Sequence, residues 1–298
     1  MAEPLPIPRP ILVTGANGQV GTELQRRVPA GFVVTPTDYD TLDITDAAQV
    51  AAAIASRPWA AVVNCAAHTA VDKAETDVLA SWQLNAVAPA ILATATKDAG
   101  IPIVQISTDY VFDGTKDAPY LPADPVGPAS VYGASKLGGE LAVRTANPAH
   151  VVLRTAWVVS AHGNNFIKTM LRVGAERPLL RVVADQIGCP TGAPDIADGV
   201  FAVLDRIVAG DQPWGTYHLV NGGEGSWHAL AEAVFAAAAP LGGPAPTVEA
   251  ITTADYPTPA RRPANSRLDT SSFVATFGHA PRPWREMVDE IVAELLGN

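Results

Sequence analysis

The sequence is poor in cysteine, with only Cys65 and Cys189 among its 298 residues. Two cysteines are too few for the disulfide framework of a secreted protein, and their separation fits no zinc motif. We therefore interpret both as buried small hydrophobic residues and expect the chain to work in the cytoplasm. The spacing of the histidines and carboxylates shows no metal motif either, so we assign no metal site.

Charge is also scarce and mostly negative. Charged residues make up 17% of the chain and the formal net charge is −10. Lysine and arginine form no continuous block. An acidic chain without a basic block repels a phosphate backbone, so we expect no nucleic-acid partner.

Long apolar runs are missing as well. We find none that approaches the roughly 20 residues of a membrane span. The first 15 residues, which include four prolines, lack the apolar core of a signal peptide. We expect no membrane partner, and we interpret the N-terminus as a short disordered lead into a strand.

Short β-rich runs alternate with longer Ala-rich helical ones over the first half of the chain. Runs such as "AVVNCAA" and "IPIVQIS" are apolar throughout, which is typical of parallel strands covered on both faces. The pattern predicts a doubly wound α/β fold with a parallel, Rossmann-type sheet and a smaller α/β lobe. We assign 1–156 to a dinucleotide-binding domain to which 191–220 returns, and 157–190 and 221–298 to a substrate-binding lobe.

Three glycines lie between the first β-rich run and the first helical one, in "ILVTGANGQVG". Gly15 allows a tight turn, Gly18 allows close approach of a phosphate, and Gly21 allows the helix to sit near the sheet. A dinucleotide pyrophosphate can rest on the N-terminus of such a helix.

An acidic residue about 20 positions further on is expected to bind a ribose hydroxyl. Asp38 fits, and "DYDTLDITD" offers others, of which Asp43 with Ile44 can contact the adenine. Each of these aspartates can also be a turn residue or a helix cap. No lysine or arginine lies between residues 28 and 56, so the sequence shows no clamp for the 2′-phosphate of NADPH and leaves NADH open.

The stretch "SVYGASKLGGE" places Tyr132 four residues before Lys136. If it is helical, the two side chains are neighbours on one face. A nearby ammonium favours the phenolate, so we expect Lys136 to lower the pKa of Tyr132 and make it a usable proton donor. A chance pair on an amphipathic helix is the alternative.

Two hydroxyls at the end of a buried run, Ser107 and Thr108 in "IPIVQISTDYVFDG", favour the catalytic interpretation. Open α/β sheets bind ligands at the carboxyl ends of their strands. A hydroxyl there can hydrogen-bond the same substrate oxygen as Tyr132.

At these motifs the chain resembles the extended short-chain dehydrogenase/reductase superfamily, and within it the dTDP-4-dehydrorhamnose reductase family. The resemblance spans about residues 11–295 and rests on "TGANGQVG", "LDITD", "NCAAHTAVDKAE", "STDYVFDG", "YGASKLGGE", "RTAWVV", "NFIKTML", "DQIGCPT" and "RRPANSRLD". It implies a catalytic set of Thr108, Tyr132 and Lys136. It implies coenzyme contacts, besides Tyr132 and Lys136, at Gly15, Asn17, Gly18, Gln19, Val20, Gly21, Asp43, Ile44, Ala66, Ala67 and Thr69.

A dTDP-sugar needs cations for its diphosphate and a flat surface for the sugar. Arg261 and Arg262 lie in a proline-rich connector and can bind the diphosphate, or they are exposed solubilising residues. Trp157 can stack on the sugar, or it is a core aromatic residue. The other substrate-binding residues that the resemblance or their position suggests are Asp109, Tyr110, Asn165 and Gln186.

We therefore expect an NAD(P)H-dependent reductase that converts dTDP-4-dehydro-L-rhamnose into dTDP-L-rhamnose. NADPH is the expected coenzyme, with NADH as a second one, and Mg²⁺ is associated with some members of the family. The alternatives are a nucleotide-sugar epimerase or dehydratase and a non-catalytic regulatory subunit. The sequence leaves monomer and homodimer open.

Overall fold

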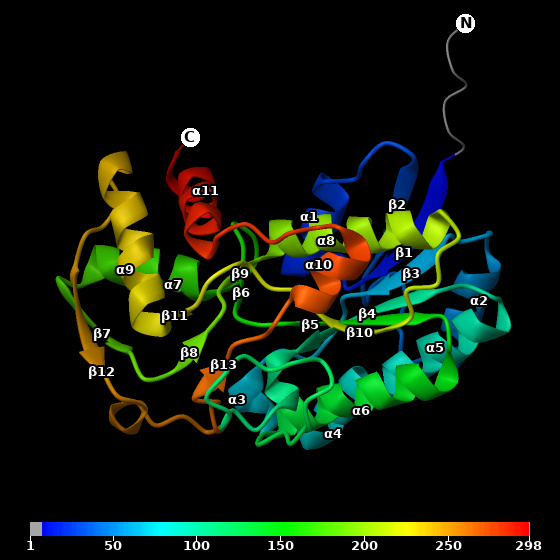
Figure 1. Cartoon of the computed structure of the whole chain (residues 1–298), viewed down its shortest axis with the longest axis horizontal. Coiled ribbons are helices and arrows are strands. Elements are labelled where there is room, and N and C mark those ends of the chain that lie inside the picture. Colours follow the sequence, from blue (N-terminus) through cyan, green and yellow to red (C-terminus); the bar gives the residue numbers. More distant parts are fainter. Residues whose placement is uncertain (1–7, 298) are drawn as a thin grey trace, which may run out of the picture.

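A six-stranded parallel sheet forms the centre of the larger lobe in the computed structural model, which describes residues 8–297 (Figure 1). Its order is β10-β5-β4-β3-β1-β2, and every neighbouring pair is parallel. The strands are β1 (Arg9–Thr14), β2 (Phe32–Thr37), β3 (Ala61–Asn64), β4 (Ile103–Thr108), β5 (His150–Thr155) and β10 (Gly215–His218). The predicted doubly wound sheet is confirmed. The predicted N-terminal lead lies largely outside the described residues.

Helices cover both faces of this sheet. Figure 1 shows α1, α8 and α10 above it and α2, α5 and α6 below it. Side chains alternate along β1, so Ile11 and Val13 pack toward α1 and α8 while Leu12 packs toward α2 and α5. The bounds are α1 (Gln19–Arg26), α2 (Ala47–Ala55), α5 (Ala88–Asp98), α6 (Val131–Ala146), α8 (Ala193–Val208) and α10 (Ser271–Phe277).

A continuous helical run precedes β4. It consists of α4 (Val78–Trp82), the π-helical turn η1 (Gln83–Val87) and α5. Its 21 residues are long and apolar enough to cross a membrane by length and composition alone, a feature that our reading of the sequence did not recognise. In this fold Ala88 and Leu92 are fully buried in the core below the sheet. The run thus contributes to the core of the larger lobe, although only 39% of its most apolar stretch is buried and Leu79 is 86% exposed.

The smaller lobe is built around three packed helices: α7 (Phe166–Glu176), α9 (Trp227–Ala238) and α11 (Trp284–Leu296). Short strands border them: β6 (Val158–Val159) pairs with β9 (Thr191–Gly192), and β7 (Leu179–Val183) pairs with β12 (Thr247–Ile251). A third sheet joins β11 (Gly225–Ser226), β8 (Ile187–Gly188) and β13 (Asn265–Ser266). The remaining elements are α3 (Val71–Ala74) and the 3-10 turns η2 (Asp109–Val111), η3 (Ala239–Leu241) and η4 (Thr253–Asp255).

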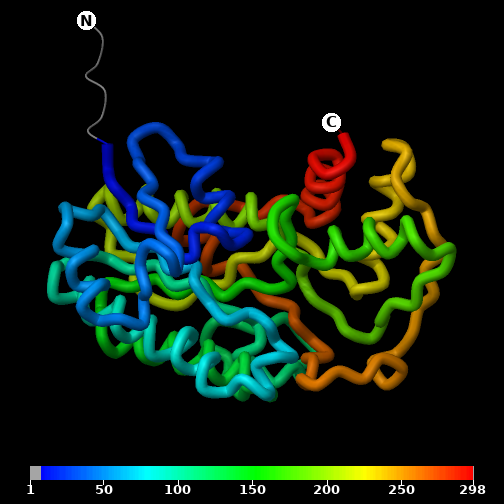
Figure 2. The backbone as a smooth tube through the Cα atoms, turned by 180° about the vertical axis from the view of Figure 1, so that it is seen from behind, coloured from blue at the N-terminus to red at the C-terminus, as the bar shows by residue number. Residues whose placement is uncertain are grey.

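The chain passes between the lobes several times, as the rear view shows (Figure 2). Helix α8 and strand β10, which lie within 191–220, belong to the larger lobe. Helix α10 differs from our expectation, because we assigned 221–298 to the smaller lobe. Phe273 and Phe277 of α10 pack in the core of the larger lobe, where their rings contact Tyr217 of β10.

Candidate active site

A cleft of about 1010 Å³ lies at the carboxyl ends of β1, β3 and β4. Strand β1 pairs with β2 on one side and with β3 on the other. From β1 the chain therefore first adds a strand on one side and then continues on the other, so the strand order reverses between β1 and β3. Open α/β sheets bind ligands at such a switch point. Ordinary ligand pockets measure about 300–1,000 Å³. This cleft is therefore large enough for a dinucleotide and a second ligand.

The glycine loop forms one end of the cleft. Gly15 has φ = +67°, and a Cβ added there would lie 2.6 Å from Ala66 Cα. A Cβ on Gly21 would overlap the Gly15 carbonyl oxygen. Gly18 is the N-cap of α1 and offers no side-chain oxygen to the first N–H groups. These groups therefore remain available to an anion, which fits a dinucleotide pyrophosphate.

Asp38, the candidate for the ribose, and Asp43, the candidate for the adenine, both line the cleft. Asp38 Oδ2 accepts a hydrogen bond from the Asn17 backbone N–H at 2.8 Å. Asp43 Oδ1 accepts from the backbone N–H and the hydroxyl of Thr45. Of the other predicted coenzyme residues, Asn17 is not among the lining residues, whereas the cleft is lined by Gln19, Val20, Ile44, Ala66, Ala67 and Thr69.

The small residues around the Tyr–Lys pair explain how α6 reaches the cleft. Ser130 caps the helix by accepting from the Gly133 N–H at 3.1 Å. A Cβ on Gly133 would overlap the carbonyl oxygen of Tyr110, and one on Gly139 would overlap that of Asn85. Glycine at these two positions lets α6 pack directly on η2 and η1.

Tyr132 and Lys136 both line the cleft and are nearly buried, with 8% and 5% exposure. Lys136 Nζ donates to the carbonyl oxygen of Ile106 at 2.7 Å. Burial lowers the pKa of Lys136 to about 8, while Glu140 opposes this shift.

Our expectation for the phenol was wrong in direction. Burial raises the pKa of Tyr132 well above its usual value, and the Thr108 hydroxyl only partly opposes this rise. Lys136 does not lower it, because its ammonium group is directed at the Ile106 carbonyl and the phenol is desolvated.

The hydroxyl that we predicted to be catalytic, that of Thr108, lies where β4 ends and η2 begins. Thr108 Oγ1 donates to Asp109 Oδ1 at 3.0 Å and accepts from the Tyr110 N–H at 3.3 Å. The Tyr110 ring stands edge-on to Tyr132, with 5.4 Å between centroids. Burial raises the pKa of Asp109 to about 6. The structure thus brings Thr108, Asp109, Tyr110, Tyr132 and Lys136 together at the cleft.

The smaller lobe supplies an aromatic wall. Trp157 lines the cleft with a left-handed backbone, φ = +48°, and its ring stacks on Trp227 with 3.7 Å between centroids. The sequence reasoning missed Trp227, which also lines the cleft. Trp227 Nε1 donates to Gln186 Oε1 at 3.1 Å, so Gln186 lies behind this wall rather than among the lining residues.

Asn165 likewise lies outside the lining of the cleft. Its Oδ1 caps α7, and its Nδ2 donates to Gln19 Oε1 at 3.1 Å and to Ser160 O at 2.6 Å. These bonds support Gln19 at the coenzyme end. The neighbouring Asn164 lines the cleft instead.

Of the two candidate diphosphate arginines, Arg262 lines the cleft and Arg261 does not. Arg262 lines the cleft, pairs with Asp72 at 2.6 Å and donates to the Tyr110 hydroxyl at 3.0 Å. Arg261 lines an adjoining hollow of about 330 Å³, which Arg262 also borders. The two arginines therefore share the adjoining hollow, and Arg262 alone also reaches the cleft.

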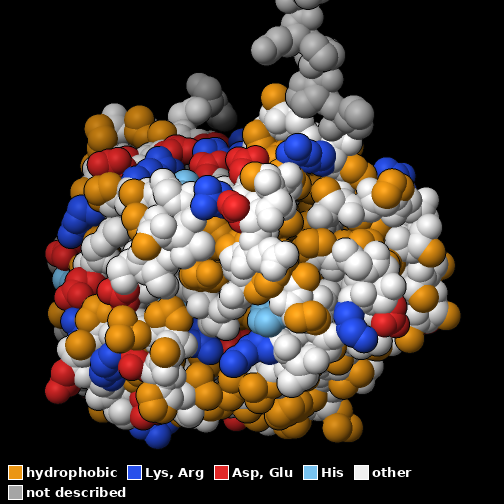
Figure 3. Space-filling model, turned by 45° about the vertical axis from the view of Figure 1, so that its right-hand side comes forward, with side chains coloured by type: hydrophobic (Ala, Val, Ile, Leu, Met, Phe, Trp, Pro, Cys, Tyr) orange, Lys and Arg blue, Asp and Glu red, His pale blue; other side chains and the backbone are white. Residues whose placement is uncertain are grey.

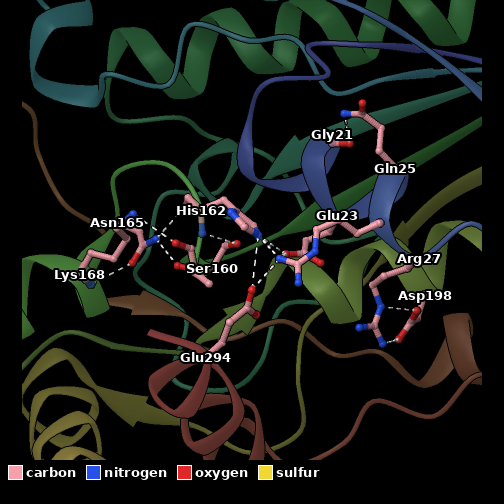
Figure 4. A network of polar contacts seen from close by, with 12 residues as sticks. Gly21, Glu23, Gln25, Arg27, Ser160, His162, Asn165, Lys168, Asp198 and Glu294 are labelled. Atoms are coloured by element: carbon pink, nitrogen blue, oxygen red, sulfur yellow. Dashed lines mark hydrogen bonds and ion pairs between the residues drawn. The ribbon is translucent and has the colours of Figure 1, made fainter. Parts of the chain in front are cut away.

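Polar contacts also fix α1 against the rest of the molecule. Figure 4 shows Glu23, His162 and Glu294 converging from α1, the loop before α7, and α11. Arg26 pairs with Glu294 at 2.7 Å, and Arg27 donates twice to Asp198 of α8. The helix that begins at the glycine loop is thus tied to both lobes.

Two asparagines that the sequence reasoning missed organise the strand ends. Asn64 accepts from the Thr14 hydroxyl at 2.6 Å and donates to Gln105 at 2.8 Å, which links β1, β3 and β4. Asn85 accepts from the His68 N–H and donates to the Ser135 hydroxyl, which joins the loop after β3 to α6. The sequence could have indicated Asn64, because it is a polar residue at the end of the apolar run "AAVVN".

Comparisons with known proteins agree with this geometry. The family described as the RmlD substrate binding domain matches residues 9–296. The dTDP-4-dehydrorhamnose reductase of Burkholderia thailandensis is 44% identical over 294 residues, 96% of this chain and 99% of the relative. The chain belongs to the dTDP-4-dehydrorhamnose reductase family. The resemblance that the motifs indicated is confirmed.

Solved structures in the dTDP-4-dehydrorhamnose reductase family share the whole architecture. The Clostridium acetobutylicum protein superposes with a TM-score of 0.90 at 40% identity, covering 96% of this chain and 99% of that one. The Bacillus anthracis protein, in complex with NADP, also superposes with a TM-score of 0.90. It is 33% identical to this chain, and the superposition covers 97% of this chain and 100% of that one.

Proposed function

We propose that this protein reduces the C4 keto group of dTDP-4-dehydro-L-rhamnose to give dTDP-L-rhamnose, with NADPH as coenzyme and NADH as a second one. The observation that carries this proposal is the convergence of Thr108, Tyr132 and Lys136 on a cleft whose other end is the glycine loop. Family membership and the NADP complex of the Bacillus anthracis relative support it.

The residues present fit a dinucleotide. The cradle between Gly15, Gly18 and Gly21 is one that a Cβ at Gly15 or Gly21 would fill, and the first turn of α1 has unpaired N–H groups. Asp38 or Asp43 would hold the adenosine ribose, and Lys136 the nicotinamide ribose. When bound, the reduced coenzyme supplies hydride to the substrate carbonyl.

Tyr132 acts as the proton donor. A phenol whose pKa is raised by burial keeps its proton at neutral pH, and it gives that proton up only when a more basic alkoxide oxygen develops beside it. Thr108, which lies next to it at the end of β4, would hydrogen-bond the same oxygen. Lys136, whose ammonium donates to the Ile106 carbonyl, would act on the coenzyme ribose rather than on the phenol.

The substrate would occupy the part of the cleft between the two lobes. Arg262, which lines the cleft, would bind the diphosphate, with Arg261 available in the adjoining hollow. Trp157, backed by Trp227, offers a flat face to the deoxysugar. Asp109 and Tyr110 lie beside the reacting carbon and can bind sugar hydroxyls.

The setting we propose is the cytoplasm, with the protein acting as a monomer or a homodimer and without nucleic acid or membrane as partner. On the face shown in Figure 3, Lys and Arg side chains lie scattered among acidic, polar and hydrophobic ones. Such a surface offers no basic band for a polynucleotide.

A coenzyme-oxidation assay with a panel of 4-keto nucleotide sugars tests the proposal. We expect dTDP-4-dehydro-L-rhamnose to consume NADPH in equal amount to the product formed. An epimerase or dehydratase would convert its sugar and return the coenzyme unchanged, and a regulatory subunit would convert nothing.

A further inference from the structure

The Thr108 hydroxyl already donates a hydrogen bond to a neighbouring side chain, that of Asp109. A threonine hydroxyl carries a single proton. In this structure Thr108 gives that proton to Asp109 Oδ1 at 3.0 Å, while its oxygen accepts from the Tyr110 N–H. As long as this arrangement lasts, Thr108 presents only a lone pair to the cleft and cannot donate to a substrate carbonyl.

The acceptor of this bond is an unusual carboxyl group. Asp109 lines the cleft but is only 3% exposed, and its Oδ2 has no hydrogen-bond partner among the described residues. The ionisable groups that face it are Tyr110 from its own turn, Tyr132 from α6 and Cys189 from the loop after β8. All three are neutral at pH 7, because burial raises their pKa values.

Cations near this carboxyl are occupied elsewhere. The Arg262 guanidinium is bonded to Tyr110 and Asp72, and the Lys136 ammonium to the Ile106 carbonyl. The Ser266 hydroxyl of β13 lies beside the carboxyl and, like Thr108, lowers the pKa of Asp109, but burial outweighs both. A buried carboxylate without a cation favours its protonated form.

We infer that Asp109 is a positioning residue that sets the direction of the Thr108 hydrogen bond. The carboxylate form takes the Thr108 proton. The carboxylic acid form donates its own proton to the Thr108 oxygen, so the Thr108 proton turns toward the substrate carbonyl. This inference rests on the proposed reduction, in which Thr108 and Tyr132 hold one oxygen.

The two forms have different catalytic capacity. With Asp109 protonated, the developing oxyanion receives hydrogen bonds from both Thr108 and Tyr132. With Asp109 ionised, it receives one from Tyr132 alone. Loss of one oxyanion donor typically costs about 10²–10³-fold in rate. We therefore expect kcat/KM to fall as the pH rises through about 6, where Asp109 loses its proton.

The variant Asp109→Asn tests this directly, because an amide N–H can donate to the Thr108 oxygen as the acid does but cannot ionise. We expect wild-type kcat/KM to decline between about pH 5 and pH 7, below the range in which Lys136 loses its proton, and that of Asp109→Asn to stay level over the same range. Asp98→Asn is the matched control, since Asp98 is an exposed carboxylate at the end of α5 whose side chain is 69% exposed. Asp98→Asn should show the same decline of kcat/KM with pH as the wild type. A decline that persists in Asp109→Asn would overturn the inference.

A second variant separates this role from general support of the fold. If Asp109 affects the pH dependence only through the Thr108 hydroxyl, kcat/KM of Thr108→Val should already be level with pH, and adding Asp109→Asn should leave it level. A decline in kcat/KM with pH that persists in Thr108→Val and disappears only when Asp109→Asn is added would contradict the inference. Equal NADPH affinity of all variants, measured by fluorescence titration, shows that the coenzyme end is intact.

A measurement independent of turnover follows the carboxyl itself. Carbon-13 NMR of the free enzyme, with Asp109→Asn identifying the signal, should show Asp109 titrating near pH 6. A midpoint near the ordinary value of about 4 would overturn the inference. If the wild type consumes no coenzyme with any 4-keto sugar, the proposed function fails as well. Normal turnover with an unchanged decline in Asp109→Asn defeats this inference alone.

Discussion

Arg154 and Glu140 form a doubly hydrogen-bonded ion pair inside the larger lobe, with Nε–Oε1 and Nη2–Oε2 distances of 2.9 and 2.7 Å. The side chains are 3% and 0% exposed. Glu140 Oε1 also accepts from the Ser107 hydroxyl at 2.5 Å. The pair therefore joins α6, which carries Tyr132 and Lys136, to the strands β4 and β5.

Glu140→Gln should strongly destabilise the protein, because it leaves the Arg154 charge buried without its counterion. Breaking a buried pair in this way typically costs about 3–5 kcal/mol. Urea unfolding followed by circular dichroism measures the loss. Glu249→Gln is the control: it breaks the exposed pair with Arg181 and should cost less than about 1 kcal/mol. Equal losses in the two variants would contradict this role.

Gly21→Ala should weaken coenzyme binding at least tenfold, because its Cβ overlaps the Gly15 carbonyl oxygen and the loop must move. Fluorescence titration with NADPH measures the affinity. Gly127→Ala should bind normally, since its Cβ would meet only Asp113 Cβ at an ordinary 3.6 Å. Wild-type affinity in Gly21→Ala would argue against a phosphate cradle at this loop.

His218→Phe should make the free energy of unfolding less sensitive to low pH. His218 is fully buried, neither ring nitrogen has a hydrogen-bond partner within residues 8–297, and burial lowers its pKa to about 3. The unfolded chain takes up the proton near pH 6.5 and the folded chain only near pH 3, so stability falls as the pH drops between these values. The slope is about 1.4 kcal/mol per pH unit for one group.

Unfolding free energies of the wild type and His218→Phe, compared from about pH 7 down to pH 4, measure this contribution. The two curves should diverge, with the variant losing less stability toward low pH. Parallel curves would mean that His218 is not the group responsible.

Arg262→Met should raise the KM for the dTDP-sugar about ten- to hundredfold, the usual worth of a hydrogen bond to a charged group, while the Kd for NADPH stays the same. Initial-rate kinetics at saturating coenzyme measures the effect. Arg172→Met, which changes an exposed arginine on α7, is the control. If Arg262→Met lost affinity for NADPH as well as for the dTDP-sugar, a role of Arg262 confined to the substrate would be contradicted.

The sequence predicted the elements whose chemistry is local. The three glycines and the apolar runs indicated a dinucleotide fold, because backbone clearance and two-sided burial leave a direct trace in residue type. The four-residue spacing of Tyr132 and Lys136 placed them on one helix face, and both reach the cleft.

What the sequence did not reveal depends on contacts between distant segments. Asn165 and Gln186 look like pocket residues by motif, yet one caps α7 and the other supports Trp227. The direction of the Tyr132 pKa shift depends on burial and on the carbonyl that holds Lys136. The four-residue spacing of Tyr132 and Lys136 reveals neither the burial of the phenol nor the carbonyl that holds the lysine.

The central claim is that Tyr132 gives its proton to the reduced oxygen, and the variant Tyr132→Phe tests it most directly. NADPH consumption with dTDP-4-dehydro-L-rhamnose is compared with the wild type, alongside NADPH binding and thermal unfolding. We predict normal folding and coenzyme binding with turnover reduced by about 10²–10⁴-fold. Turnover close to that of the wild type would contradict the account.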